Sequence, residues 1–388
     1  MLLQKNDSFR KNIKQLPNAK KEIKTISMGK VTIIVSFIFA SLFMLFNTFV
    51  LAQNTDNGPK LKIYSGFKGG SYYQMAKDMQ SMSRKLYGKA NYAISELEVP
   101  KIDPTTKDTI KGAEGNIEYD VQVSKTPTGD TIDFLEVCES DGSYYNFLKI
   151  NTIDVDIAFL QYDVLLYESE KDLSRKFKKT EDIRVLLPLG SEEIHLITLK
   201  DSKINAFSDL KKKRVAIGSS LQGTNITATY IKGVTNGKWI DVDIPYDKVF
   251  HALFSHDIDA FFFVGKVPVH DLKTLPKSMK DKLKMVSLPE NDKLKEAYGE
   301  QVTIDNSTYS WIPNGESINT YSVRSLLVTS LTGQTPEKKE NIVKLLEAIK
   351  QLKDNSGYHE SWKTIQFQKL PKTEMEWPYY DAAVKLYN

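Results

Sequence analysis

The chain has 388 residues, with 41% hydrophobic and 26% charged side chains, a composition typical of a globular protein rather than a disordered or multi-spanning one. This length predicts two lobes or domains instead of a single core. Residues 1–52 hold eight Lys or Arg and two acids, and the remainder holds 45 basic and 47 acidic side chains, so the net charge of +4 is concentrated near the N-terminus. The remainder is near neutral and has no basic surplus that would favour nucleic-acid binding.

Residues 1–52 are predicted to be a signal peptide. A basic leader precedes an apolar run from Val31 to Ala52, and small residues occupy the two positions that signal peptidase reads before Gln53. Translation is predicted to start at Met28, which leaves a compact leader. The alternative is an uncleaved anchor, because a mostly apolar run of this length can span a bilayer. In both cases we expect an exported protein, either periplasmic or tethered to the outer face of the inner membrane.

A first lobe is predicted over residues 61–190, after a polar linker at residues 53–60. Its expected elements are a strand at 61–66, a helix at 71–86, a strand that ends at Cys138, a helix from Ser143 and a strand at 156–160. Residues 98–131 are rich in Pro, Thr, Gly, Lys and Asp. We interpret them as a surface insertion that contains a short strand at Tyr119–Val123.

Two segments of this lobe share one layout, in which an apolar strand ends in small hydrogen-bonding residues and a helix follows. The first is Gly66-Phe67-Lys68-Gly69-Gly70-Ser71-Tyr72-Tyr73, and the second is Asp141-Gly142-Ser143-Tyr144-Tyr145-Asn146. Helix N-termini present free backbone N–H groups and partial positive charge, which favour an anionic or polar ligand. The two turns therefore predict a binding cleft at the carboxyl ends of the strands.

A strand over residues 184–199 is predicted to carry the chain out of the first lobe. The second lobe, residues 191–320, repeats the alternation of strands and helices, and residues 321–388 return to the first lobe. The elements expected here are a short helix, strand and turn at 209–218, a helix from Thr224, a buried strand at 258–265 and a helix capped by Thr335-Pro336. The predicted fold class is α/β, with two lobes, mainly parallel sheets, flanking helices and a hinged cleft.

Four segments in this order resemble the TAXI branch of TRAP-transporter solute-binding proteins, and the resemblance covers residues 60–388. They are Gly66–Tyr73, Asp141–Leu148 with Gln161-Tyr162-Asp163, Phe207–Gly218, and Asp257–Pro268. The resemblance implies a type II periplasmic-binding-protein fold, in which a receptor catches a solute between two lobes and hands it to a TRAP-type membrane permease. It also implies a small polar solute with a carboxylate, such as glutamate or another dicarboxylate. We expect no cofactor and no metal.

The chain departs from this family in three places. The insertion at 98–131 is not part of the family's core, and the turn at Ser219–Asn225 contains less glycine and serine than usual. The C-terminal Trp377–Ala383 matches the family's ending only loosely. These departures bear on the identity of the ligand more than on the fold.

Candidate ligand-binding residues follow from the turns and from the resemblance. In the first lobe they are Gly70, Ser71, Tyr72, Ser143, Asn146 and Gln161, and in the second lobe Ser219, Thr224, Asn225, Phe263 and Trp311. Structural roles remain open for several of them. The glycines can serve tight turns, Gln161 can end its strand, Trp311 can pack in a core, and helix caps can be formed by Ser71, Ser143 and Thr224. Available counter-charges for an anion are Lys68, Lys266 and Arg324.

Two other classes of function are weighed against transport. Enzyme motifs are missing from the sequence: its five histidines show no HExxH spacing, and Gly218–Gly223 misses the GxSxG pattern by one residue. The single cysteine, Cys138, can form neither an internal disulfide nor a cysteine pair for zinc. We therefore expect no enzyme. A receptor that senses its solute without feeding a permease has the same sequence features and stays an alternative.

Overall fold

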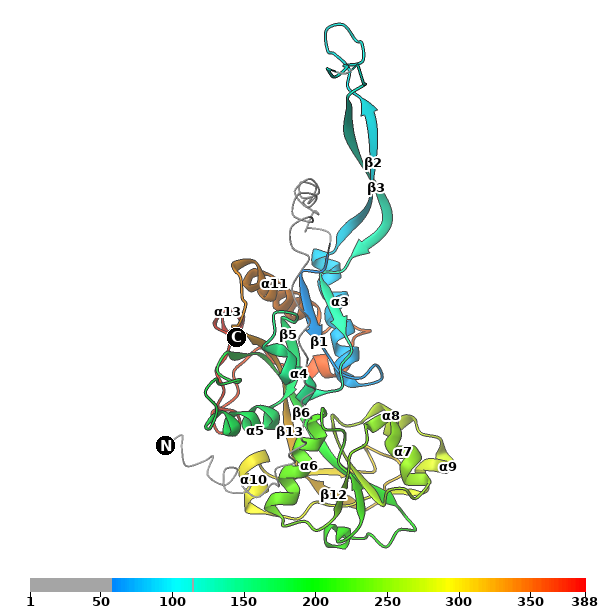
Figure 1. Ribbon diagram of the computed structural model, residues 1–388. Coiled ribbons are helices and arrows are strands. Elements are labelled where there is room, and N and C mark those ends of the chain that lie inside the picture. Colours follow the sequence, from blue (N-terminus) through cyan, green and yellow to red (C-terminus); the bar gives the residue numbers. More distant parts are fainter. Residues whose placement is uncertain (1–57, 114) are drawn as a thin grey trace, which may run out of the picture.

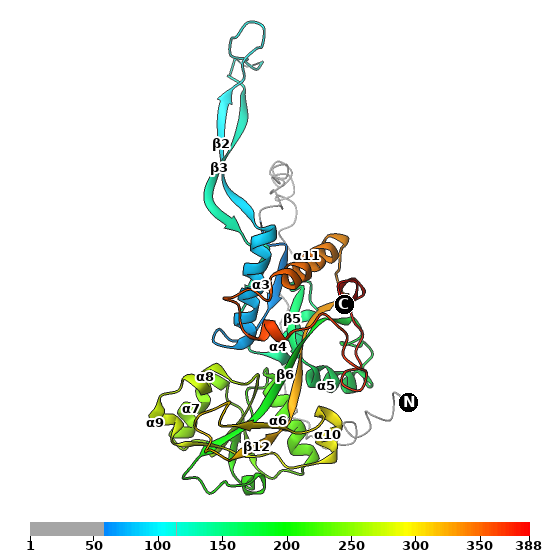
Figure 2. The same ribbon diagram turned by 180° about the vertical axis from the view of Figure 1, so that it is seen from behind.

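The structure is a computed structural model that describes residues 58–113 and 115–388. Two lobes lie one above the other, and a long arm projects from the upper one in both views (Figures 1 and 2). The predicted leader at residues 1–52, with the start at Met28, lies outside the described residues. Within the ranges that are described, no helix is long and apolar enough to cross a bilayer.

The first lobe combines elements from both ends of the chain, because the residues after the second lobe return to it. Its strands are β1 (Leu61–Tyr64), β4 (Leu135–Cys138), β5 (Ile157–Gln161), the first part of β6 (Ile183–Leu199) and β13 (Ser322–Ser330). Its helices are α3 (Ser71–Tyr87), α4 (Ser143–Ile150), α5 (Tyr162–Asp172), α11 (Pro336–Leu352), α12 (Ser361–Thr364) and α13 (Asp381–Val384).

The second lobe is formed by the middle of the chain. Its strands are the last part of β6, β7 (Arg214–Ala216), β8 (Ile240–Val242), β9 (Ala260–Gly265), β10 (Leu283–Met285), β11 (Val302–Asp305) and β12 (Ser317–Thr320). Its helices are a 3₁₀ turn at Phe207–Leu210, α6 (Gly223–Val234), α7 (Tyr246–Phe254), α8 (His270–Thr274), α9 (Lys277–Lys280) and α10 (Asp292–Tyr298).

One nine-stranded sheet runs through both lobes in the order β4-β1-β5-β13-β6-β9-β7-β8, with β10 beside β6. In the first lobe, β1 pairs parallel with β4 and β5, and β13 lies antiparallel between β5 and β6. In the second lobe, β7 pairs parallel with β8 and β9, whereas β6 is antiparallel to β9 and β10. Each lobe is therefore mainly parallel, with one antiparallel strand that arrives from the other lobe. This confirms the predicted α/β fold class with two lobes and flanking helices, although the two expected sheets form one continuous sheet.

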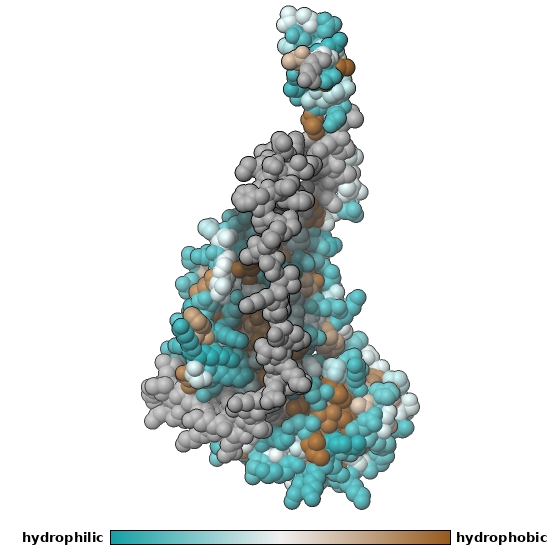
Figure 3. Space-filling model, in the orientation of Figure 1, coloured by the Kyte–Doolittle hydropathy of each residue, from teal (hydrophilic) through white to brown (hydrophobic). Residues whose placement is uncertain are grey.

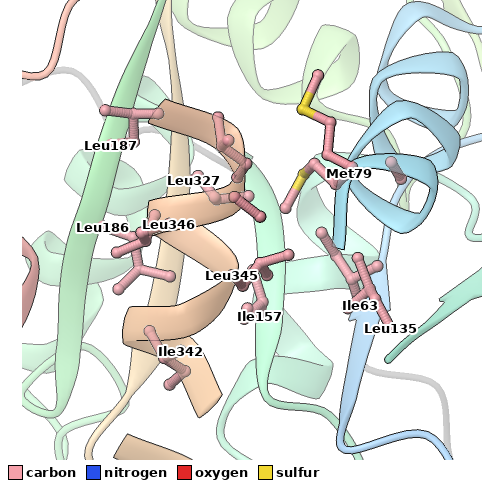
Figure 4. Packing of buried hydrophobic residues seen from close by; sticks show 14 of the residues in the cluster. Ile63, Met79, Leu135, Ile157, Leu186, Leu187, Leu327, Ile342, Leu345 and Leu346 are labelled. Carbon is pink, nitrogen blue, oxygen red and sulfur yellow. The ribbon is translucent and has the colours of Figure 1, made fainter. Parts of the chain in front are cut away.

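The core of the first lobe lies between this sheet and the helices α3 and α11 (Figure 4). Helix α3 buries Met75, Met79 and Met82 at helical spacing, and α11 does the same with its stripe of Ile and Leu. The predicted cap of α11 is confirmed, because the Thr335 hydroxyl accepts the backbone N–H of Lys338 at 3.1 Å. Each fully buried side chain of this kind contributes about 1.5–3 kcal/mol. The core therefore fixes α3, and with it the turn that precedes α3.

The second lobe has two cores, one on each face of its part of the sheet. Trp239 and Phe262 belong to one core, and Phe261, Tyr309 and Trp311 belong to the other. Trp311 is 7% exposed and stacks on Tyr309, with ring centroids 5.5 Å apart. The structure therefore assigns Trp311 to core packing, which was one of its two possible roles.

The insertion is a long two-stranded arm. Strands β2 (Lys89–Pro100) and β3 (Tyr119–Ile132) are antiparallel, pack chiefly against each other and extend far from the lobes (Figure 1). The prediction of a short strand at Tyr119–Val123 is too small. Tyr119, Val121 and Val123 alternate with polar residues, which is the signal that predicts a strand there, whereas residues 125–130 contain no apolar side chain by which the strand could be extended.

The described surface is mainly hydrophilic on the face that Figure 3 shows, and the larger apolar patch lies over the second lobe. Apolar areas of this extent occur on many soluble proteins and by themselves indicate no partner. The feature that distinguishes this molecule is therefore the space between its lobes.

The inter-lobe cleft as a candidate binding site

A cleft lies between the lobes where the N-termini of α3, α4 and α6 approach one another. The first lobe contributes the turns before α3 and α4, the end of β5 and the middle of β6. The second lobe contributes the turn before α6, the start of α7, the end of β9 and the start of α8. The volume of the cleft is ≈ 100 Å³, which suits a small solute rather than a peptide. The cleft thus lies at the carboxyl ends of parallel strands, where ligands of open α/β sheets bind.

The three helices that point at the cleft begin without side-chain caps. Their N-cap residues are Gly70, Gly142 and Gln222, and none of these accepts a capping hydrogen bond with its side chain. The possible role of Ser71, Ser143 and Thr224 as helix caps is therefore wrong, because all three residues lie inside the first turn of their helices. The N–H groups of a first turn have no partner within the helix. These helix starts consequently present donors to the cleft.

Two hydroxyl groups join helix starts to neighbouring strands. The Ser143 hydroxyl accepts the backbone N–H of Gln161 at 2.7 Å, and the Thr224 hydroxyl accepts the backbone N–H of Val264 at 3.3 Å. A hydroxyl that accepts one hydrogen bond keeps its own proton for another. Both side chains can therefore position their helices and still donate to a ligand.

Glu192 lies at the back of the cleft, on the strand that crosses between the lobes, and is 6% exposed. Its Oε2 accepts a hydrogen bond of 2.8 Å from the Gln161 side chain. Burial raises the pKa of Glu192 to about 7, against the opposing effect of donors from Gln161 and Tyr72. The Tyr72 hydroxyl couples to Glu192 electrostatically, but it is buried and meets the geometry of a hydrogen bond with none of the described groups.

Aromatic rings from both lobes form one wall of the cleft. The ring of Phe263 on β9 stacks on Tyr246 at the start of α7, with centroids 4.0 Å apart. Phe67, from the first lobe, lies against the same tyrosine at 5.7 Å. Burial holds the pKa of Tyr246 well above its usual range, and its hydroxyl has no hydrogen-bond partner among the described residues. This wall therefore offers apolar surface together with one neutral donor.

The lobes are in contact at the α6 turn. A Cβ placed on Gly223 would lie 1.6 Å from the Oε1 of Gln161 and 3.0 Å from the Cβ of Ser143. No larger residue fits between the two lobes here unless one of them moves. Gly223 is thus needed for close approach, which is one of the reasons for glycine in a turn.

Charged residues at the cleft are mostly acidic. Asp141, Glu192 and Asp271 line it, together with Lys266 and His270. The Lys266 ammonium donates to the Thr364 hydroxyl of the first lobe at 2.9 Å, and burial lowers its pKa. A single lysine, held to a neighbour, is therefore the main positive side chain of the described lining.

A sequence model of the NMT1-like family matches residues 119–388, more than two thirds of the chain. The chain belongs to the NMT1-like family. The match includes the whole second lobe and the turn before α4, whereas the turn before α3 precedes it. Most of the cleft of this NMT1-like protein therefore lies within the matched region.

Solved structures resemble this NMT1-like chain distantly. AF1704 from Archaeoglobus fulgidus is 11% identical, with a TM-score of 0.38 over 78% of this chain and 80% of that one. XAC2383 from Xanthomonas citri, bound to ATP, is 11% identical, with a TM-score of 0.38 over 75% and 83%. An arginine 3rd transport system periplasmic binding protein from Legionella pneumophila is 14% identical, with a TM-score of 0.32 over 59% and 81%. Similarities of this size carry no argument about what the NMT1-like protein binds.

Seven of the eleven residues predicted to bind a ligand line the cleft of the NMT1-like protein. They are Gly70, Ser71, Tyr72, Ser143, Gln161, Thr224 and Phe263. Gln161 does more than end its strand, because its side chain contacts Glu192 inside the cleft. These seven predicted residues therefore lie on both sides of the cleft.

The other four predicted residues do not line the cleft. Asn146 is fully buried and donates to the backbone carbonyls of Ser65 and Phe159 at 2.8 and 2.9 Å, so it ties β1 to β5. Asn225 donates to the Gly218 carbonyl at 3.2 Å, and the Ser219 N–H donates to the Gln222 side chain at 2.9 Å. These two shape the α6 turn, and Trp311 packs in the core.

The three basic residues predicted as counter-charges for an anion, Lys68, Lys266 and Arg324, do not lie together in the structure. Of the three, Lys266 alone lines the cleft. Arg324 donates to Ser191 at 2.8 Å and pairs with Glu374 on the other side of the crossing strands, and Lys68 is exposed. The expected cationic pocket for an anion is therefore weaker than the sequence indicated.

Sequence reasoning missed two residues at the centre of the site, Glu192 and Tyr246. Glu192 stands in Gly190-Ser191-Glu192-Glu193-Ile194, which reads as a polar break in a strand rather than as a buried acid. Tyr246 follows Pro245 at the start of a short helix. One signal was available: a break in the apolar pattern of a crossing strand marks the place where its side chains face the cleft.

Proposed function

We propose that this NMT1-like protein is an extracytoplasmic receptor that captures a small polar solute, bearing a carboxylate, between its lobes and delivers it to a TRAP-type membrane permease. One observation carries the proposal. The cleft holds three buried polar atoms without partners among the described residues: the Tyr72 hydroxyl, the Gln161 Oε1 and the Tyr246 hydroxyl. A buried polar group without a hydrogen bond costs about 1–3 kcal/mol, so a solute that pairs these atoms is favoured.

The carboxylate of the solute is proposed to bind at the helix starts. Helices α3 and α6 approach the cleft from opposite lobes, and their uncapped first turns direct N–H groups and partial positive charge toward it. The hydroxyl groups of Ser143 and Thr224 lie beside these turns and can donate as well. An anionic group held there would join the two lobes.

Closure is then a shift of population between an open and a closed state. The solute favours the closed state through the contacts that it makes only there. A change of the open-to-closed ratio from 99:1 to 1:99 needs about 5.5 kcal/mol of differential affinity. Hydrogen bonds to charged groups contribute roughly 1.5–3 kcal/mol each, so three or four are enough.

Binding is favoured over catalysis by the state of the hydroxyl groups. The Ser143 and Thr224 hydroxyls accept backbone N–H groups, and no histidine nitrogen contacts either of them. His195, the histidine buried in the second lobe, is held between the Tyr309 hydroxyl and the Glu193 carbonyl.

Coupling to a TRAP-type permease rests on the resemblance of the turns to TAXI proteins.

Native mass spectrometry of the purified protein, before and after denaturation, tests the proposal. We expect a small solute to leave on denaturation, and the same compound to stabilise the stripped protein by about 2.7 kcal/mol at a hundredfold excess over its Kd. Uptake of that compound by cells should require the intact gene. A protein that carries nothing, and that no compound in a broad screen of metabolites stabilises, would contradict a receptor function.

A further inference from the structure

We propose that Glu192 receives a protonated amine of the solute, so that the cleft selects compounds that carry an ammonium group. This inference rests on the proposed function and narrows its ligand class. A dicarboxylate without an amine, which the resemblance allows, is then a poor ligand.

The hydrogen bonds of Glu192 leave one oxygen for a ligand. Its Oε2 accepts from Gln161, whereas its Oε1 receives no hydrogen bond from the described residues. Glu192 lines the cleft and is 6% exposed, so its side chain retains contact with the space of the cleft. The Gln161 Oε1 beside it is buried without a partner, and the Tyr72 hydroxyl is in the same state. An ammonium group has three N–H donors and can serve two such acceptors together.

Among the described residues Glu192 forms no salt bridge, although Lys266 is close enough to interact with it electrostatically. The facing groups on neighbouring elements are Tyr72 on α3, Gln161 and Asp163 at the β5–α5 junction, Glu193 and His195 on β6, Arg324 and Ser325 on β13, and Asp141, Lys266, His270 and Asp271 at the rim. The named charges that act most on Glu192 are those of Glu193 and Asp163, and both are negative. The two cations are held elsewhere, Lys266 by Thr364 and Arg324 by Ser191 and Glu374.

A buried carboxylate without a salt-bridge partner destabilises the protein, and a cationic ligand bound beside it would remove this free-energy cost. Burial of an unpaired charge is compensated when an opposite charge binds beside it. A metal ion does not fit, because no group of three His, Cys, Asp or Glu side chains suited to metal binding occurs in the described residues. A ligand carboxylate placed beside Glu192 would add a fourth negative charge to those of Glu192, Glu193 and Asp163. An amine remains as the chemistry that fits.

The position of Glu192 also gives the amine a role in closure. Glu192 pairs with Val323, so it lies where the two crossing strands run side by side. Gln161 comes from the first lobe and touches Gly223 of the second. An amine bound between Glu192 and Gln161 would therefore hold the side chain against which the second lobe closes.

The test compares compounds that differ in the amine alone. Thermal shift and calorimetry are carried out on the purified protein with the twenty standard L-amino acids, their 2-oxo counterparts, putrescine, spermidine, succinate and glutarate. We expect every compound that stabilises the wild type to carry an amine, and its deaminated counterpart to bind at least tenfold more weakly. Because Glu192 must be ionised and its pKa is about 7, affinity should fall about 30-fold between pH 8 and pH 5.5.

Two variants separate this from a general loss of structure. Glu192→Gln should weaken amine binding at pH 8 by at least tenfold and remove the dependence on pH. Glu193→Gln makes the same change of charge one residue away on the opposite face of β6. It should keep the affinity at pH 8, and because the Glu193 charge raises the pKa of Glu192, the pH dependence should shift to lower pH without disappearing. Circular dichroism confirms that each variant is folded, and the pH series on the wild type tests the proposal without any substitution.

The outcomes are distinguishable. Tight binding of a deaminated compound, or unchanged amine binding in Glu192→Gln, overturns the inference and leaves the proposed function intact. Affinity that rises as pH falls would mean that protonated Glu192 donates to a carbonyl or carboxylate, which also overturns it. Absence of binding by every compound, with nothing co-purified, overturns the proposed function and the inference together.

Discussion

The backbone N–H of Tyr145, in the first turn of α4, donates to the backbone carbonyl of Leu221 in the second lobe at 2.9 Å. This bond uses one of the N–H groups that a helix start leaves free. It lies beside Gly142 and Gln222, where the two turns pass within van der Waals contact of each other. The structure therefore presents the lobes in mutual contact, and contact at this point depends on small side chains.

Gly223→Ala is expected to hold the lobes apart. The new methyl group would overlap the Gln161 side chain, whose displacement breaks its hydrogen bond to Glu192. Loss of one hydrogen bond to a charged group weakens solute binding by roughly 1.5–3 kcal/mol, or more than tenfold. Native mass spectrometry measures how much co-purified solute is retained.

The matched control is Gly112→Ala in the arm, where the added Cβ meets neighbours at ordinary distances of 3.7 Å and beyond. This variant should retain solute as the wild type does. If Gly223→Ala retains solute equally well, close approach at the α6 turn is not required for binding.

Glu192→Gln is expected to stabilise the unliganded protein at alkaline pH. The pKa of Glu192 is raised from 4.5 to about 7 in the folded state, so the folded protein binds more protons than the unfolded chain between these values. Stability then falls as pH rises from 4.5 to 7, by on the order of 3 kcal/mol in full. Glutamine removes this loss.

Urea denaturation at pH 5 and pH 8 measures the difference. The free energy of unfolding of Glu192→Gln should be close to that of the wild type at pH 5 and higher at pH 8. A variant that is less stable than the wild type at pH 8 would show that ionised Glu192 supports the fold.

Asn146→Ala is expected to destabilise the fold rather than change the site. The substitution removes the donor to two buried carbonyls, Ser65 O and Phe159 O, each of which costs about 1–3 kcal/mol when left unpaired. The denaturation midpoint of the unliganded protein should therefore fall. Ser71→Ala is the control, because the Ser71 hydroxyl makes no side-chain hydrogen bond to a described residue, and it should leave that midpoint unchanged. An unaltered midpoint in Asn146→Ala would restore Asn146 to the candidate binding residues.

Removal of the arm is expected to leave the cleft intact. Ala90 and Thr131 are paired across the base of the hairpin, so an Asn-Gly turn in place of residues 91–130 closes the shortened ribbon. Because β2 and β3 pack chiefly against each other, the unfolding free energy of the lobes should change by about 0.5 kcal/mol or less. Calorimetry with a solute that binds the wild type checks the site. Loss of binding would indicate that the arm supports the first lobe.

The elements that could be predicted from the sequence are those with strong local signals. The stripe of Ile342, Leu345, Leu346 and Ile349 identified α11, and glycines followed by Ser71 and Ser143 identified the starts of α3 and α4. Only part of the arm was predicted, because Tyr119, Val121 and Val123 alternate with polar residues whereas residues 125–130 contain no apolar side chain. Its strands are defined by pairing with each other, which local patterns do not reveal.

The turns that form the cleft could be predicted from the sequence, but the buried charge of Glu192 could not. Asn146 and Ser143 looked equivalent in the sequence, yet Ser143 lines the cleft and Asn146 faces the backbones of β1 and β5. On a helix, residues three apart lie near one face, and small differences in orientation separate core from surface. Glu192 required knowledge of which strands pair, because its burial comes from neighbours that are distant in the chain.

The nine-stranded sheet has a mechanical consequence for any opening of the lobes. Because β6 and β13 are hydrogen-bonded to each other from Ile183–Ser330 to Glu193–Ser322, the lobes cannot separate without flexing this ribbon. Its irregular register near Ser325 and Leu327 gives two points at which such flexing is easiest. Any separation of the lobes must therefore bend β6 and β13 together at these two positions.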